Sequence, residues 1–250
     1  MSDVVVLCYH AVADDWAADL CVTPDRLEAQ LQLLVDRGYR GATFREAVLA
    51  PPASRTVAVT FDDAFRSVIQ RAFPVLERLR LPGTVFAVTG VVGQPPPMSW
   101  PGIDRWIGGP HEPELECMSW DELGRLADSG WEIGSHTHSH PRLTTLDDQT
   151  LDEELVTSRE VCAKRLGRTC ASLGYPYGDH DPRVIVAARR AGYEAAGTLP
   201  GPLHPPEPLR WPRVGVYHRD DARRFRAKVS PLVRGLRASR AWHRLATSIR

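Results

Sequence analysis

Short apolar runs alternate with amphipathic stretches along most of this 250-residue chain. The intervening segments, including 24–38 and 146–166, carry apolar residues at helical spacing. Runs with the length and flanking turn residues of strands occupy residues 4–8, 39–44, 56–61, 84–88, 131–134, 171–175, 193–197 and 211–216. Such alternation predicts a parallel sheet, and seven or eight units predict one α/β domain rolled into a (β/α)7–8 barrel.

Residues 90–117 depart from this alternation. They are rich in proline, glycine and tryptophan and are too long for an ordinary connection, so we expect a loop that covers a site. Trp100 and Trp106 in this segment, and Trp120 just after it, are of a type that can stack on sugar rings. Tryptophans in long loops more often pack the loop against the protein, and no role is assigned to these three.

The C-terminal residues 222–250 contain no acidic residue and many arginines. Apolar residues between the arginines predict a basic, helical tail that follows a barrel domain of residues 1–221. Such a helix could make peripheral contact with an anionic membrane surface, although a solvated terminal helix is the simpler alternative.

The bulk composition excludes several classes of protein. Basic and acidic residues number 31 each, so no overall basic field favours nucleic acid. Five cysteines lack the paired spacing of thiolate zinc sites and are expected to be reduced, with Cys8 and Cys170 as small core residues. The N-terminal residues show neither a signal peptide nor a membrane span, so the expected location is the cytoplasm.

Two clusters of polar residues directly follow predicted strands. His136, His138 and His140 come after the strand at 131–134, and Asp62 and Asp63 come after the strand at 56–61. Imidazole is a common zinc ligand, and metal-dependent hydrolysis needs one carboxylate on the ion and a second to accept a proton. A polar turn and a helix N-cap are the simpler alternatives. The spacing alone does not choose between His138 and His140.

Two further polar residues, His10 and Tyr177, also follow predicted strands. In a parallel barrel, the carboxyl ends of all strands meet at one face, which is the catalytic face of such enzymes. We therefore expect His10, Tyr177 and both polar clusters to lie together.

Two motifs in this sequence resemble those of a known enzyme family. Residues 60–63 (T-F-D-D) are similar to a T-F-D-D-G motif, and residues 136–140 (H-T-H-S-H) are similar to H-[ST]-x-x-H. The chain thus resembles the polysaccharide deacetylases of carbohydrate esterase family 4, which share the NodB homology domain, from about His10 to Arg213. The resemblance implies a distorted barrel and metal-dependent removal of an N-acetyl group from an N-acetylated glycan.

The resemblance also implies roles for individual residues. Asp63, His136 and His140 would bind a divalent metal ion, with Zn²⁺ expected first and Co²⁺ or Ni²⁺ as alternatives. Asp62 would be the general base. Residues 173–178 resemble a third motif, in which the Tyr177 position gives a backbone N–H to the oxyanion hole.

The opening of the chain is similar to one branch of that family. Residues 9–12 (Y-H-A-V) resemble the Y-H-x-[VI] of the circularly permuted branch, which includes poly-N-acetylglucosamine deacetylases. In that branch the histidine, here His10, is the general acid. Two positions depart from the family pattern: Ala64 replaces a glycine, and Gly174 replaces an arginine that orients the catalytic aspartate. Arg213 resembles an arginine of some relatives and is the candidate replacement.

Two other functions remain open at the level of sequence. One is a hydrolase of the same fold acting on a non-sugar C–N bond, and the other is a catalytically silent carbohydrate-binding module. Retention of Asp62 beside the expected ligands argues against the silent module, which needs no proton acceptor. The sequence does not specify the sugar, its carrier or the oligomeric state.

Overall fold

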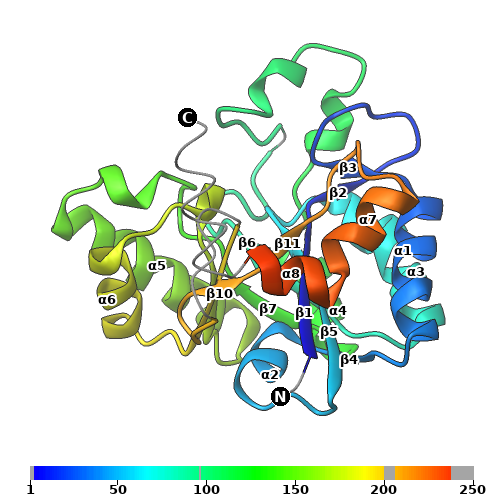
Figure 1. Cartoon of the computed structure of the whole chain (residues 1–250). Helices are drawn as coiled ribbons and strands as arrows, with labels where there is room; N and C mark the ends of the chain where they lie inside the picture. Colours follow the sequence, from blue (N-terminus) through cyan, green and yellow to red (C-terminus); the bar gives the residue numbers. More distant parts are fainter. Residues whose placement is uncertain (1–2, 96, 200–205, 238–250) are drawn as a thin grey trace, which may run out of the picture.

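The computed structural model describes residues 3–95, 97–199 and 206–237 (Figure 1). Its main feature is a sheet whose paired strands all run parallel. The strands of this sheet are β1 (Asp3–Tyr9), β4 (Arg40–Ala42), β5 (Arg55–Asp62), β6 (Gly83–Ala87), β7 (Glu132–Ser135), β8 (Ser172–Gly174), β9 (Ala195–Thr198), β10 (Trp211–Pro212) and β11 (Val214–Gly215). A separate parallel pair consists of β2 (Ala11–Val12) and β3 (Cys21–Val22).

The sheet is a nearly closed barrel. Its strand order is β10-β9-β8-β7-β6-β5-β1-β11, with β4 paired beside β5. The two end strands, β10 and β11, are separated only by Arg213, so one extended segment pairs with β9 on one side and with β1 on the other. The prediction of a (β/α) barrel is therefore confirmed, and Arg213 lies at the point where the barrel closes.

Helices connect the strands. The α-helices are α1 (Pro24–Asp36), α2 (Phe44–Leu49), α3 (Phe73–Leu79), α4 (Trp120–Asp128), α5 (Asp148–Leu166), α6 (Pro182–Arg190), α7 (Ala222–Val229) and α8 (Pro231–Arg237). Shorter helical turns are η1 (Val68–Ala72), η2 (Asp104–Trp106), η3 (Glu112–Leu115), η4 (Leu143–Thr145) and η5 (Pro176–Gly178). Figure 1 shows α1 and α3 on one flank of the sheet and α5 and α6 on the opposite flank.

The core is built around β5, which is buried at every position after its first residue. Phe61 of this strand stacks on Tyr9 and on Trp131, with ring centroids 5.7 and 5.8 Å apart. Gly83 makes room for Trp131, because a Cβ at that glycine would lie 2.4 Å from the indole ring. A strand buried on both faces needs apolar residues throughout, which explains the near-continuous apolar run at 56–61.

The helical segment between β5 and β6 is irregular. It starts with a π-helical turn, η1, and becomes an α-helix only at Phe73. The next residue is Pro74, which has no N–H to donate to the carbonyl four residues earlier. The predicted strand at 39–44 is also shorter, because Thr43 and Glu46 form a capping box that starts α2 at Phe44.

The described part of the C-terminal segment packs on the barrel. Phe225 and Val229 of α7 are buried, and Arg234 of α8 donates a hydrogen bond to the carbonyl of Val4 in β1. Residues 238–250 of the predicted basic tail lie outside the described residues. Among the described helices, none is both long and apolar enough to cross a membrane.

Candidate active site

The polar residues singled out in the sequence come together at the carboxyl ends of the strands. Tyr9 pairs with Phe61 at the ends of β1 and β5, so the residues that follow, His10 and Asp62, are neighbours. One cavity of about 380 Å³ is lined by every predicted site residue except the buried Arg213: His10, Asp62, Asp63, His136, His140 and Tyr177. These residues follow different strands and, as expected for the carboxyl ends of parallel strands, they lie together.

Asp63, His136 and His140 form a compact, buried group. Asp63 Oδ1 lies 3.5 Å from His136 Nε2 and 3.4 Å from His140 Nε2. Ligands about 2.1 Å from a tetrahedral zinc ion are themselves about 3.4 Å apart. Asp63 Oδ1 is buried and has no hydrogen-bond partner among the described residues, as expected for an atom reserved for a cation. The three side chains thus fit a divalent metal ion.

The electrostatics of this group also fit a cation. Burial and the charge of Asp62 raise the pKa of Asp63 well above its ordinary value. Burial also lowers the pKa of His136 and, together with the nearby His136, lowers that of His140 to about 2. The imidazoles are therefore neutral at pH 7 and available as ligands, and a bound cation would favour the ionised form of Asp63.

Unusual backbone conformations hold this arrangement. Left-handed conformations are costly for residues other than glycine, and those at the site are Asp63, Ala64, Thr137, His140 and Tyr177, with φ between 57° and 71°. Ala64, at the position of the family's glycine, adopts the required left-handed turn with φ 57°. Strain of this kind persists only where the surrounding contacts impose it, which is typical of functional sites.

The middle histidine of the cluster points elsewhere. His138 Nδ1 lies 3.1 Å from Thr89 Oγ1, and His138 is not in the group around Asp63. His136 Nδ1, by contrast, lies 2.7 Å from the carbonyl oxygen of Gly174. This contact orients the ring so that Nε2 faces Asp63.

A buried ion pair holds Asp62 beside this group. Arg213 donates hydrogen bonds to both carboxylate oxygens of Asp62, at 2.6 and 2.8 Å, and a third to Thr60 Oγ1 at 3.1 Å. Burial disfavours the charged carboxylate and is the largest single effect, but the attraction and hydrogen bonds of Arg213, together with the nearby His136 and His10, outweigh burial and lower the pKa of Asp62. Asp62 is therefore ionised at neutral pH.

Glycines make room for this guanidinium and for His136. A Cβ at Gly197 would lie 2.7 Å from Cδ and Nε of Arg213, and a Cβ at Gly174 would lie 3.0 Å from His136 Nδ1. Position 174 therefore has little room for a side chain beside His136, and the Arg213 side chain packs directly against Gly197. Arg213, the candidate replacement for the arginine that Gly174 replaces, is in contact with Asp62.

Substituting Gly197 by alanine is expected to lower the free energy of unfolding by about 1–3 kcal/mol, because the new methyl group overlaps the Arg213 side chain. Urea denaturation monitored by circular dichroism measures the change. Gly124→Ala is the matched control: a Cβ there meets open space within α4, and alanine should raise stability by about 0.5–1 kcal/mol. Equal stability of Gly197→Ala and the unsubstituted protein would contradict this packing argument.

His10 and Tyr177 complete the predicted set. His10 Nε2 lies 4.0 Å from Asp62 Oδ2, and burial lowers the pKa of His10 to about 4, although the Asp62 charge opposes this shift. The backbone N–H of Tyr177 donates to no backbone carbonyl among the described residues. The Tyr177 ring packs on the ring of His140, with centroids 4.6 Å apart.

Three contacts at the site were not predicted from the sequence. The ring of Trp100 lies 4.5 Å from that of His140, and the segment around it lines the cavity, as expected for a loop over a site. Tyr217 also lines this cavity. Cys8 is buried, as predicted, but its Sγ also lies 3.3 Å from Asp62 Oδ2 and donates to it. The tryptophan-rich composition of 90–117 was the only sequence signal for any of these contacts.

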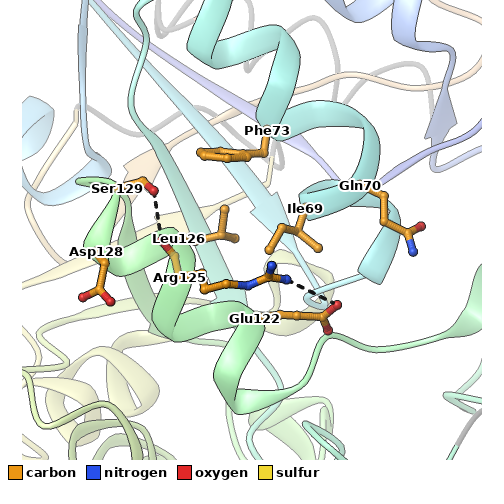
Figure 2. A pocket seen from close by; sticks show the side chains of 8 residues that line it. All are labelled: Ile69, Gln70, Phe73, Glu122, Arg125, Leu126, Asp128 and Ser129. Atoms are coloured by element: carbon orange, nitrogen blue, oxygen red, sulfur yellow. Dashed lines mark hydrogen bonds and ion pairs between the residues drawn. The ribbon is translucent and has the colours of Figure 1, made fainter.

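A second cavity shares no residue with this site. Figure 2 shows it between the η1–α3 segment and α4, with Phe73 and Ile69 on one side and Leu126 on the other. Its volume is about 460 Å³, larger than that of the first cavity. It contains the Arg125–Glu122 ion pair but no group of metal-ligating side chains. Volume alone therefore does not identify the chemically competent site.

The sequence is similar to those of known polysaccharide deacetylases. The sequence model for polysaccharide deacetylases matches residues 50–196. The Bacillus subtilis protein YxkH is 26% identical over 198 residues, covering 77% of this chain and 63% of that protein. A poly-β-1,6-N-acetyl-D-glucosamine N-deacetylase of Staphylococcus aureus is 23% identical over 191 residues, covering 71% of this chain and 61% of the enzyme. The chain thus spans less than two thirds of the length of these relatives.

Solved structures share the fold. A polysaccharide deacetylase from Bacillus cereus, BC0361, superposes with a TM-score of 0.72 and 26% identity, covering 91% of this chain and 69% of that one. IcaB from Ammonifex degensii superposes with a TM-score of 0.69 and 24% identity, covering 96% and 98% of the two chains. Because the family's sequence model covers more than half of the chain and includes Asp62, Asp63, His136 and His140, this protein belongs to the polysaccharide deacetylase family.

Proposed function

We propose that this protein is a metal-dependent hydrolase that removes the N-acetyl group from an N-acetylated glycan. The observation that carries the proposal is the group Asp63, His136 and His140 at ligand spacing, with the ionised Asp62 held beside it by Arg213. A binding module would not need a second, separately charged carboxylate at this position.

The three ligands would hold a divalent ion, with Zn²⁺ proposed first and Co²⁺ or Ni²⁺ as alternatives for the same donor set. Such an ion, when bound, lowers the pKa of water and polarises a carbonyl oxygen. Trp100 and Tyr177, whose rings pack on His140, help to exclude bulk water from that ligand.

The remaining residues account for the proton movements. Asp62 accepts a proton from the water that attacks the acetamide carbonyl carbon, and the Tyr177 N–H donates to the developing oxyanion. The C–N bond then breaks, and His10 protonates the departing nitrogen. His10 is neutral at rest because of its lowered pKa, so it must first receive a proton. Asp62 Oδ2, 4.0 Å away, can supply the one it took from water. Acetate and a free amine result.

The substrate proposal follows the relatives. The Staphylococcus aureus relative is named as a deacetylase of poly-β-1,6-N-acetyl-D-glucosamine, and the cavity of about 380 Å³ is within the range of small-molecule sites. We therefore propose that N-acetylglucosamine units of a glycan enter this cavity. Peripheral membrane contact through residues 222–250 is a separate proposal, supported by the basic residues of α7 and tested by vesicle co-sedimentation.

An acetate-release assay tests the proposed reaction. Protein loaded with Zn²⁺ or Co²⁺ is offered N-acetylglucosamine oligomers, nucleotide sugars, N-acetylated glycolipids and cyclic ureides. We expect acetate and a free amine from at least one glycan, loss of activity after chelation and recovery when metal is restored. Ureide hydrolysis without acetate release would favour the non-sugar C–N hydrolase. Metal and glycan binding without turnover would favour the silent module.

A further inference from the structure

The loop at residues 136–140, which carries two of the proposed metal ligands, is hydrogen-bonded to one carboxylate of a neighbouring helix. Glu154 of α5 accepts hydrogen bonds from the backbone N–H groups of His138 and Ser139, at 2.8 and 2.9 Å. It also accepts one from the Ser139 hydroxyl at 2.5 Å. Hydrogen bonds to an ionised carboxylate are stronger than those between neutral groups. Three of them therefore fix residues 138–139, immediately before the ligand His140.

The same helix holds the start of the loop. Ser135, the last residue of β7, donates from its hydroxyl to Ser158 Oγ at 2.8 Å and accepts from the Thr137 N–H at 3.0 Å. Ser158 lies four residues after Glu154, so both side chains face the loop from one side of α5. Two anchors on one rigid helix thus restrain the loop that carries His136 and His140.

The loop needs such restraint because its backbone is strained. Thr137 and His140 have φ of 67° and 64°, a conformation that costs about 1–2 kcal/mol per residue when nothing compensates. In this strained conformation His140 Nε2 lies 3.4 Å from Asp63 Oδ1. We propose that Glu154 is a positioning residue for the metal centre: it holds His140 in binding geometry without touching the ion. This inference rests on the proposed metal site.

Metal titration of the intact chain tests this role. Glu154→Ala is expected to raise the Kd for Zn²⁺ and Co²⁺ by about 10–100-fold, as for the loss of other groups that support ligands. Glu154→Gln and Ser139→Ala, which remove part of this hydrogen bonding, should have smaller effects. The visible absorption of bound Co²⁺ reports ligand geometry and should change in the Glu154 variants. The matched control is Glu153→Ala, since Glu153 is exposed and its described hydrogen-bond partner is Gln149.

The outcomes separate this inference from the proposed function. A lower melting temperature for metal-free Glu154→Ala, with unchanged Kd and Co²⁺ spectrum, would show a merely structural role and overturn the inference, but not the proposed metal site. Equal weakening by Glu153→Ala would also overturn it. Absence of metal binding by the unsubstituted protein would overturn both. If Glu154→Ala does not fold, the isosteric variant Glu154→Gln and the variant Ser139→Ala test the positioning role by the same Kd and Co²⁺ absorption measurements.

Discussion

Replacing Asp62 by asparagine is expected to lower kcat for acetate release by about 100- to 10,000-fold, the usual contribution of a general base. Asparagine has nearly the same shape, and its carbonyl oxygen can still accept a hydrogen bond from Arg213, but it cannot take a proton from water. Asp62 is 1% exposed, so no bulk solvent replaces it. The proposed ligands Asp63, His136 and His140 are unchanged, and metal affinity should therefore remain close to that of the unsubstituted protein.

The contrast with the adjacent carboxylate makes this prediction specific. Asp63→Asn should weaken Zn²⁺ binding, because it removes the only charged ligand of the proposed set, whereas Asp62→Asn should not. Calorimetric titration gives the affinity, and the acetate assay at saturating metal gives kcat. Undiminished kcat in Asp62→Asn would remove Asp62 from the role of base. Loss of metal affinity in that variant would instead place Asp62 among the ligands.

The fold was predictable because each unit is local. A strand buried on both faces needs a near-continuous apolar run, as in β5, and the helices between strands begin at recognisable caps such as Asp147 and Asp181. Parallel strands then bring their carboxyl ends to one face. Asp62 and His136, separated by 74 positions in the sequence, were therefore expected to be neighbours, and their side chains lie 3.9 Å apart.

The local sequence pattern could not show which of the three histidines are the proposed metal ligands. In an extended segment, residues 136, 138 and 140 would share one face. The left-handed conformation of Thr137 breaks this periodicity and turns His138 towards Thr89. Such a conformation depends on contacts with α5 that are distant in sequence, so only the family resemblance pointed to His140.

Local sequence pattern could not reveal the contacts of Arg213 and Trp100 for a related reason, and only the family resemblance pointed to Arg213. β10 and β11 have two residues each, too few for any periodicity, and the ion pair with Asp62 exists only because the barrel closes there. Trp100 reaches His140 from a loop without regular structure. Barrel closure and loop packing bring together residues that are far apart in the sequence, so local sequence patterns do not predict which side chains they place at the site.

Removing the charge of Arg213 is expected to affect both stability and pH dependence. Arg213→Met leaves the 1%-exposed Asp62 carboxylate without its bidentate partner, and breaking a buried ion pair on one side costs about 3–5 kcal/mol. Arg213 lowers the pKa of Asp62 in the intact site, so its loss raises that pKa. A base is lost when it is protonated, and the acidic limb of the kcat/KM profile should therefore move to higher pH.

Arg210→Met is the matched control, three residues earlier in the same segment. Its guanidinium pairs with Glu207 near the surface, where the two side chains are 23% and 59% exposed, and such a pair contributes about 0–1 kcal/mol. Arg213→Lys retains the charge but not the two-point contact, so its acidic limb should lie between those of the Met variant and the unsubstituted protein. An unmoved acidic limb in both Arg213 variants would show that the essential base is not the carboxylate held by this arginine. Asp62 would then be excluded as the proton acceptor, even if urea denaturation showed the expected loss of stability.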